Sequence, residues 1–181
     1  MELRETGIEG LIEIAPRVFG DERGWFLESY NQARYDSLIK GTRFIQDNLS
    51  CSMKGVVRGL HFQAPPFSQA KLVSVIQGKV LDVAVDLRRS SATYGKVFTV
   101  ILDGERKNQL FIPRGFAHGF ASLEDHTVFA YKCDNPYSKE SERTLIWNDS
   151  DLDIDWGVTT PSLSEKDKTG EAFRSFLSPF E

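Results

Sequence analysis

The sequence has few cysteines, few histidines and no long apolar run. Two cysteines among 181 residues, Cys51 and Cys133, are too few for a disulfide scaffold, and we expect both to stay reduced. No apolar stretch approaches the roughly 18 residues of a membrane span. The charged start of the chain lacks the apolar core of a signal peptide. These absences predict a soluble cytoplasmic protein with no membrane partner.

The charge balance shows no excess of basic residues. The net charge is −4 and the isoelectric point is about 5.5, which argues against nucleic acid as a partner. An anionic ligand would therefore need a local basic pocket. The length fits one domain with a sizeable core, and no repeat, low-complexity tract or linker divides it, so we expect a single domain over residues 1–181.

Two of the three histidines lie in short glycine-containing motifs, residues 58–63 (RGLHFQ) and 113–120 (PRGFAHGF). His61 and His118 are therefore candidates for either metal binding or proton transfer. A metal site would need three or four ligands, but Gln63 stands where a second histidine would complete a His-x-His pair. No glutamate follows closely, and Lys71 would repel a cation. The motifs favour proton transfer without a metal or other cofactor.

Short runs bounded by Gly, Pro, Asn and Asp predict an all-β fold. A hairpin is predicted over residues 71–87, turning at Gln77–Gly78, together with strands at residues 25–30, 44–52, 55–63, 96–102, 109–112, 119–123, 127–133 and 144–147. One helix is expected over residues 31–40, with Asn31 as N-cap and Gly41 as the stop. A second short helix is expected near residues 171–176.

Polar residues follow the two-residue period of several strands. Gln46, Asn48 and Ser50 share one face of their strand, and His61 and Gln63 share a face of theirs. A solvated outer face explains any single strand. Because several strands carry amide and imidazole groups in this way, the pattern also fits a barrel or sandwich with a polar interior.

The order of these motifs resembles that of the dTDP-4-dehydrorhamnose 3,5-epimerases over nearly the whole chain, although no match is apparent after about Thr169. The resemblance rests on residues 21–26 (DERGWF), 46–50 (QDNLS), 58–63, Gln69, 71–73, 86–88, 113–120, 131–132, Tyr137, 142–143, 147–149 and 163–167 (LSEKD). It implies an antiparallel jelly-roll (cupin) barrel with one or two short peripheral helices. It also implies an isomerase that needs no metal and no other cofactor.

The resemblance implies four catalytic residues. His61 matches the base that removes a proton beside the C4 ketone of dTDP-4-dehydro-6-deoxy-D-glucose, and its ordinary pKa suits that task. Asp167 matches the group that orients this histidine. Tyr131 matches the acid on the opposite face of the sugar, and Lys71 matches the cation that stabilises the enolate oxygen.

The resemblance also implies a set of substrate-binding residues and a homodimer. Guanidinium groups suit phosphate oxygens, and Tyr137 could stack on thymine. Some nucleotide contacts in the family come from a neighbouring subunit, which would apply to Arg23 and Glu28. The implied binding residues are Arg23, Glu28, Gln46, Asn48, Arg58, His118 (beside the enolate or behind it) and Tyr137.

Four other functions stay open. A mono-epimerase that inverts only C3 or only C5 would use the same groups, with Trp25 and Phe67 as places for a specificity difference. A sugar 3,4-ketoisomerase fits less well, because its Arg-Gly-x-His-x-His pattern would need a histidine at Gln63. A binding module without turnover would not need His61, Tyr131 and Asp167 together. A metal-dependent cupin is the fourth alternative.

Overall fold

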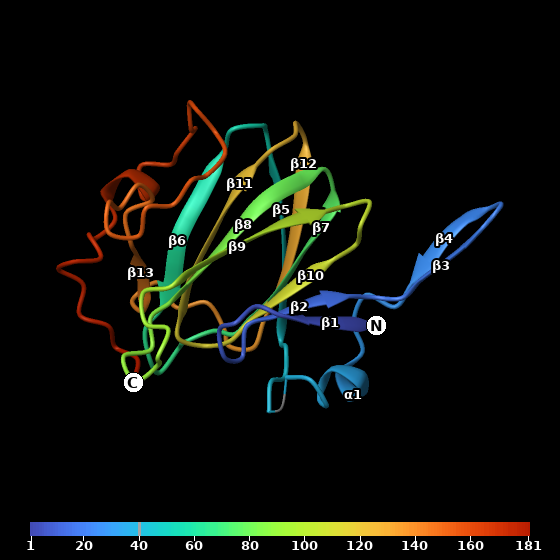
Figure 1. The fold of residues 1–181 in the computed structure, drawn as a ribbon, viewed down its shortest axis with the longest axis horizontal. Helices are drawn as coiled ribbons and strands as arrows, with labels where there is room; N and C mark the ends of the chain where they lie inside the picture. Colours follow the sequence, from blue (N-terminus) through green and yellow to red (C-terminus); the bar gives the residue numbers. More distant parts are fainter. Residues whose placement is uncertain (40) are drawn as a thin grey trace.

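The computed structural model describes residues 1–39 and 41–181, and two antiparallel sheets dominate it (Figure 1). The six-stranded sheet has the order β1 (Glu2–Glu5), β2 (Ile12–Ala15), β10 (Gln109–Ile112), β7 (Lys71–Gln77), β12 (Thr127–Cys133) and β5 (Gln46–Ser52). The five-stranded sheet has the order β13 (Glu142–Thr144), β6 (Val57–Gln63), β11 (Phe116–Ser122), β8 (Lys79–Asp86) and β9 (Val97–Asp103). The sheets face one another as a cupin-type jelly-roll barrel, which confirms the predicted fold class.

The predicted hairpin over residues 71–87 is wrong in its pairing, although its turn is placed correctly. β7 ends at Gln77 and β8 begins at Lys79, but the two strands enter opposite sheets. β7 pairs with β10 and β12, whereas β8 pairs with β11 and β9. The reason is core formation, because Val73 and Val75 from one sheet join Val80 in a single buried cluster.

Most other strands lie where the punctuation predicts them. β10 and β12 match their predicted ranges residue for residue, and β5, β6, β9 and β11 differ from theirs only at the ends. Three strands were not predicted: β1, β2 and β3 (Val18–Asp21). All four residues of β1 are exposed, so this strand carries no buried face that sequence periodicity could reveal.

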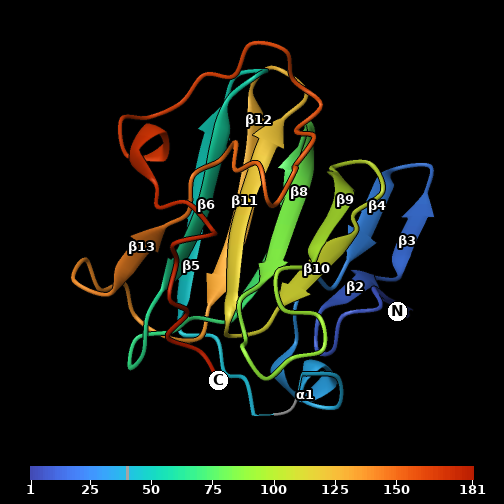
Figure 2. The ribbon, with the colours of Figure 1, turned by 60° about the vertical axis from the view of Figure 1, so that its left-hand side comes forward.

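β3 pairs with β4 (Gly24–Leu27) in a two-stranded hairpin, which projects from the body of the molecule (Figures 1 and 2). Four of its apolar side chains, Val18, Phe19, Trp25 and Phe26, are exposed. An isolated two-stranded hairpin is marginally stable in water, so we expect this hairpin to pack against another protein surface.

The predicted helices are shorter than expected or absent. The helix α1 covers Gln32–Tyr35, and the side chain of Asn31 accepts a hydrogen bond from the Arg34 backbone N–H, which confirms the N-cap. The helix ends at Tyr35, so the stop at Gly41 is wrong, and Lys40 lies outside the described residues. Tyr35 is buried and its hydroxyl donates to Gln109 Oε1 at 2.7 Å, which fixes the chain after one turn.

No helix forms over residues 171–176; a 3-10 helix covers Asp167–Thr169 instead. The following tail runs along the five-stranded sheet, where Phe176 and Phe180 pack edge-on against Phe62. Backbone hydrogen bonds also join Glu171 to Thr144 and Ile146. Six residues gain little from forming a helix, whereas these aromatic side chains gain from burial in the core. Among the described residues, no helix is long and apolar enough to cross a membrane.

Candidate active site

A cavity of about 330 Å³ lies between the sheets, within the usual size range of ligand sites. Strands from both sheets contribute to its wall, together with the start of the 3-10 helix and the residues just before it. The lining residues are Ser50, Arg58, His61, Lys71, His118, Gly119, Phe120, Phe129, Tyr131, Glu142, Ser164, Lys166 and Asp167. All four predicted catalytic residues therefore meet in one cavity, together with Arg58 and His118.

The two histidine motifs lie on neighbouring strands. His61 of β6 and His118 of β11 are direct cross-strand partners. The glycines of both motifs allow the two backbones to approach closely, because a Cβ atom on Gly59 would lie 2.5 Å from Gly119 Cα. Both imidazoles line the same cavity.

A strand irregularity brings Arg58 to the same cavity. Arg58 and His61 are three residues apart and would face opposite sides of a regular strand. The register of β6 against β11 shifts between His118 and Phe120, and both Arg58 and His61 line the cavity. Arg58 Nε donates to Ser52 Oγ at 3.2 Å, which steadies the guanidinium.

His61 and Asp167 form a close pair. His61 Nε2 lies 2.6 Å from Asp167 Oδ1, and the Asp167 side chain is 4% exposed. Asp167 also accepts hydrogen bonds from the Gly59 backbone N–H at 3.2 Å and from Ser164 Oγ at 2.6 Å. Three donors therefore hold the carboxylate, and the carboxylate holds the imidazole.

Burial and hydrogen bonding set the pKa values of this pair. Burial alone would raise the pKa of Asp167, but the hydrogen bonds from His61 and Ser164 outweigh it and lower the pKa to about 2. Burial lowers the pKa of His61 below 6.5, and the nearby cations Lys166 and Lys71 act in the same direction, against the raising effect of Asp167. The site thus holds a neutral imidazole beside an ionised carboxylate at neutral pH, as a general base requires.

Lys71 and Tyr131 reach the cavity from the opposite sheet. Lys71 begins β7 and Tyr131 lies on β12, next to Phe129. Burial lowers the pKa of Lys71 from 10.5, and burial raises the pKa of Tyr131 above 10. The phenol therefore stays protonated near neutral pH and can donate a proton.

His118 belongs to a second, deeper histidine–aspartate pair. Its Nε2 atom lies 3.0 Å and 3.1 Å from the two carboxylate oxygens of Asp82, which is fully buried on β8. The imidazole stacks against Phe129 with ring centroids 6.1 Å apart. His118 thus combines cavity lining with a fixed orientation.

Four further polar residues of the cavity received no role from the sequence: Ser50, Glu142, Ser164 and Lys166. Glu142 forms an ion pair with Lys166 and accepts a hydrogen bond from the Tyr137 hydroxyl at 3.2 Å. Ser164 holds Asp167 as described above. Glu142, Ser164 and Lys166 all lie in motifs that carried the resemblance, so their place in those motifs was the available signal.

Several predicted binding residues lie outside this cavity. Gln46 and Asn48 lie on the same face of β5 as Ser50, which lines the cavity. They are hydrogen-bonded to each other at 3.0 Å, but neither of them lines the cavity. Tyr137 is 57% exposed and reaches the cavity edge only through Glu142. Glu28 pairs with Arg34 at 3.2 Å, away from His61.

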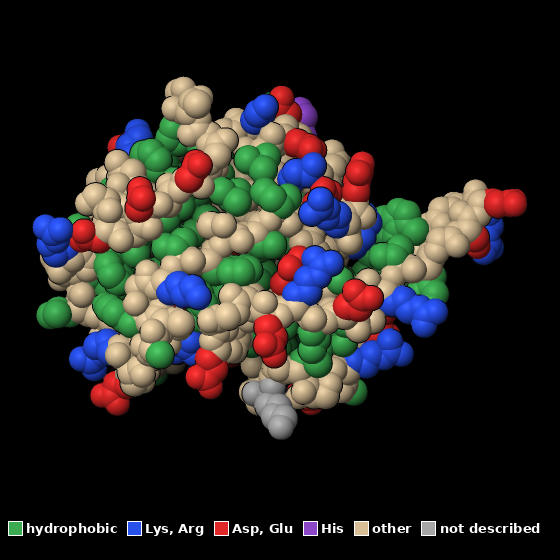
Figure 3. All heavy atoms as spheres, in the orientation of Figure 1, with side chains coloured by type: hydrophobic (Ala, Val, Ile, Leu, Met, Phe, Trp, Pro, Cys, Tyr) green, Lys and Arg blue, Asp and Glu red, His purple; other side chains and the backbone are tan. Residues whose placement is uncertain are grey.

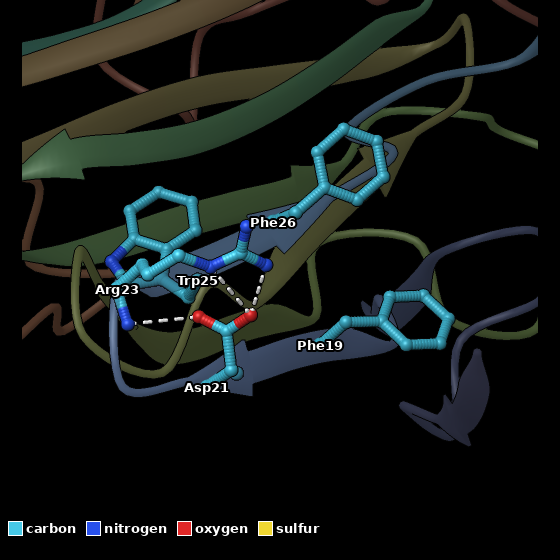
Figure 4. Close-up of a pocket in the computed structure, with 7 residues that line it drawn as sticks. Phe19, Asp21, Arg23, Trp25 and Phe26 are labelled. Atoms are coloured by element: carbon cyan, nitrogen blue, oxygen red, sulfur yellow. Dashed lines mark hydrogen bonds and ion pairs between the residues drawn. The ribbon is translucent and has the colours of Figure 1, made fainter.

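Arg23 lies on the projecting hairpin, where it binds Asp21 beside Trp25 (Figure 4). These side chains border a separate exposed hollow, lined by the hairpin residues alone. Within one chain, the structure therefore does not bring Arg23 and Glu28 to the histidine–aspartate pair.

The donor set of the main cavity fits a divalent metal poorly. Over residues 1–39 and 41–181, no group of three or more His, Cys, Asp and Glu side chains is arranged to hold a metal ion. The Gln63 amide donates to the backbone carbonyls of Phe67 and Pro136, at 2.6 Å and 3.1 Å. Gln63 is therefore already occupied within the protein.

The fold and the site together define a class of protein: a cupin barrel whose cavity carries an acid/base pair and several cations, suited to a carbonyl substrate with an anionic group. A family model described as dTDP-4-dehydrorhamnose 3,5-epimerase matches residues 5–175, beyond the point where motifs were apparent in the sequence. The chain belongs to the dTDP-4-dehydrorhamnose 3,5-epimerase family and is an isomerase.

Individual relatives agree with this placement. The chain is 49% identical over 174 residues to the dTDP-4-dehydrorhamnose 3,5-epimerase of Shigella flexneri, covering 96% of both chains. It resembles the Legionella pneumophila epimerase solved with dTDP-4-keto-L-rhamnose, with a TM-score of 0.94 and 46% identity over 97% of this chain and 94% of that one. A 3'-monoepimerase from Streptomyces bikiniensis solved with dTDP-quinovose has a TM-score of 0.87 and 30% identity, covering 93% and 86%.

Proposed function

We propose that this chain, acting as one domain over residues 1–181, inverts C3 and C5 of dTDP-4-dehydro-6-deoxy-D-glucose and yields dTDP-4-dehydro-L-rhamnose. The observation that carries the proposal is the meeting of the His61–Asp167 pair, Tyr131 and Lys71 in one cavity. The relatives named dTDP-4-dehydrorhamnose 3,5-epimerase support both inversions.

The chemistry follows from the C4 ketone, which acidifies the protons on its two neighbouring carbons. His61 removes the proton from C5 or C3, and the electron pair moves to the C4 oxygen as an enolate. Lys71 stabilises that negative oxygen, and His118, held by Asp82, lies in the same cavity wall. Reprotonation at carbon from the opposite face inverts the centre.

Tyr131 is the proposed acid for that reprotonation. It reaches the cavity from the six-stranded sheet, whereas His61 reaches it from the five-stranded sheet, so the two groups approach a bound sugar from different walls. Its raised pKa keeps the phenol protonated until it donates. Before the next turnover, the phenolate regains a proton from solvent and the imidazolium of His61 releases to solvent the proton that it took from carbon.

Cations around the cavity suit the diphosphate of the substrate. Arg58 and Lys166 line the cavity from different elements and offer charge to phosphate oxygens. Gln46, Asn48 and Tyr137 are assigned to the nucleotide, because they lie next to the cavity along β5 and beyond Glu142.

We also propose that the protein is a homodimer in which the projecting hairpin packs on a second copy. Trp25 is 60% exposed and Phe26 is 68% exposed, and apolar side chains gather where this hairpin leaves the body (Figure 3). Burying them would also bring Arg23 and Glu28 to the partner's nucleotide site. Size-exclusion chromatography with light scattering tests this assignment, and a monomer at working concentration would refute it.

A mono-epimerase is the second candidate, because the fold accommodates both outcomes: the Streptomyces bikiniensis relative is described as a 3'-monoepimerase. The test is to incubate the protein with dTDP-4-dehydro-6-deoxy-D-glucose and to determine the product configuration by proton NMR couplings. Inversion at both carbons supports the proposal. Inversion at one carbon identifies a mono-epimerase, and binding without conversion identifies a binding module.

A further inference from the structure

The carboxylate that holds His61 comes from a surface segment rather than from a barrel strand. Asp167 lies within residues 162–171, which we call the Asp167 strap. The strap begins at Ser162, where its backbone forms a parallel bridge with Val56, just before β6. Most side chains of the strap are exposed, but that of Asp167 is buried. The position of this carboxylate therefore depends on how the two ends of the strap are held.

The strap ends against the backbone at the end of β13 and just beyond it. The Glu171 N–H donates to the Thr144 carbonyl at 2.8 Å, and the Ile146 N–H donates to the Glu171 carbonyl at 2.9 Å. Gly170 immediately precedes this contact and directly follows the 3-10 helix. One short turn therefore joins the anchored end of the strap to Asp167.

Gly170 lies in close contact with the backbone of Leu145 and Ile146. A Cβ atom at position 170 would lie 2.5 Å from the Leu145 carbonyl carbon and 2.5 Å from the Ile146 nitrogen. The backbone of Gly170, with a φ of −65° and a ψ of 157°, suits any residue. The close approach alone therefore requires a glycine, and an alanine would have to separate the two backbones.

The strap is the side that would move. Leu145 is fully buried, its N–H donates to the Leu60 carbonyl at 2.9 Å, and its carbonyl accepts from the Leu60 N–H at 3.3 Å. Leu60 is also fully buried and directly precedes His61. Closely packed core residues resist displacement more than an exposed segment does. The Leu145 backbone thus lies between the strand that carries His61 and the strap that carries its carboxylate partner.

We infer that Gly170 is a positioning residue: its lack of a side chain lets the Asp167 strap lie against the Leu145 backbone and so keeps Asp167 within hydrogen-bond distance of His61. This assignment rests on the proposed function, because it takes His61 as the base of the reaction. The His61–Asp167 distance is 2.6 Å. A displacement of about 1 Å would take the pair beyond hydrogen-bond range, and a misplacement of that size can cost on the order of 10²-fold in rate.

The charged groups that face His61 set the sign of the expected change. They are Asp167 and Lys166 from the strap, Lys71 from β7 and Glu142 from β13. The hydrogen bond with Asp167 raises the pKa of His61 more than the charge of Lys166 lowers it. Displacing the strap weakens both effects, so the pKa of His61 should fall.

Gly170→Ala tests the inference through two measurements. The first is an NMR titration of His61 without substrate, and the second is kcat for the sugar. We expect the pKa of His61 to fall toward its value in Asp167→Asn and kcat to fall by about fivefold or more. Gly104→Ala is the matched control, because a Cβ atom there would lie 3.0 Å from the Ile76 carbonyl oxygen, outside the cavity. It should lower stability without changing either measurement.

Glu171→Pro gives the decision if Gly170→Ala does not fold. Proline removes the N–H that donates to Thr144, and the ψ of Gly170 suits a residue before proline. The pKa of His61 and kcat should fall in this variant as well. Glu171→Ala keeps the N–H and should leave both unchanged.

Two outcomes would overturn the inference. One is an unchanged His61 pKa with kcat within twofold of the wild type, in Gly170→Ala or in Glu171→Pro. The other is an equal further loss of kcat when Gly170→Ala is combined with Asp167→Asn, because a residue that acts through Asp167 has little left to change there. The titration needs no turnover, so its result is separate from the proposed function, which fails only if the wild type does not convert the sugar.

Discussion

Replacing Asp167 by asparagine removes the carboxylate charge while keeping the size of the side chain. The carboxylate is held by His61, Ser164 and Gly59, and its pKa falls from 3.8 to about 2. That difference corresponds to roughly 2 kcal/mol, since one pKa unit is about 1.36 kcal/mol. Three hydrogen-bond donors contribute to this free energy, so the part that stabilises a protonated His61 is about 1–2 kcal/mol.

This share corresponds to a loss of roughly 5- to 30-fold in kcat for Asp167→Asn. The loss should be smaller than the roughly 10²–10⁴-fold expected for His61→Ala, which removes the base itself. Initial rates from proton NMR of the sugar substrate, compared at saturating substrate, measure both effects.

The pH dependence gives an independent readout. Asp167 raises the pKa of His61, so its removal should lower that pKa further. His61 acts as a base only when neutral, so the acid limb of kcat/KM should lie below pH 6.5 in the wild type and move to still lower pH in Asp167→Asn. An acid limb that moves upward, or a kcat within twofold of the wild type, would refute the assigned role of Asp167.

Tyr131→Phe should still exchange the substrate proton for solvent deuterium but should invert C5 slowly, and wild-type inversion rates would exclude the phenol as the acid. Arg58→Ala should weaken dTDP binding by about 1.5–3 kcal/mol in calorimetry, whereas unchanged affinity would place Arg58 outside the phosphate site. Turnover should survive exhaustive chelation by EDTA, and loss of activity that one divalent metal restores would contradict a metal-free mechanism. Asp86 is fully buried. Hydrogen bonds from Arg88, Ser91 and Thr93 outweigh the effect of burial and lower the pKa of Asp86 to about 2. Asp86→Asn should therefore reduce the free energy of unfolding measured in urea at pH 7. The lowered pKa stabilises the fold above about pH 4, and this stabilisation is lost as the pH falls through about 2. The difference in unfolding free energy between Asp86→Asn and the wild type should therefore shrink in acid. A difference that grows in acid would refute this reasoning.

The strands of the barrel were predictable because their local signals agree with their environment. β10 and β12 carry apolar residues bounded by turn residues, and both match the prediction. Pairing was not predictable in the same way. The short connection after Gln77 suggests a hairpin, but β7 and β8 belong to opposite sheets, and that choice depends on core packing between segments distant in sequence.

The tail shows a second limit of local reasoning. Residues 171–176 include alanine and phenylalanine at a spacing that suits a helix, yet Phe176 is buried against Phe62 of β6. Tertiary burial outweighs a weak helical preference in so short a segment. The helix α1 likewise begins at its predicted cap, but burial of Tyr35 ends it early.

The cavity residues could be anticipated to different degrees. His61 was a candidate for proton transfer from its motif alone, whereas the roles of Lys71, Tyr131 and Asp167 were predicted only through the resemblance. The structure places all four in one cavity. Asp82 gave no local signal, because a lone aspartate in an apolar strand does not reveal that it faces His118 across β8 and β11. Contacts of this kind follow from sheet register, which the sequence alone does not specify.

The most direct test of double epimerisation is proton NMR of dTDP-4-dehydro-6-deoxy-D-glucose with the wild-type protein in deuterated water. The proposed mechanism predicts that deuterium enters both C3 and C5 and that the L-configured sugar accumulates. It also predicts that His61→Ala abolishes most of this exchange at both carbons. Deuterium at only one carbon, or no exchange while dTDP still binds, would contradict the proposal that one histidine base serves both inversions.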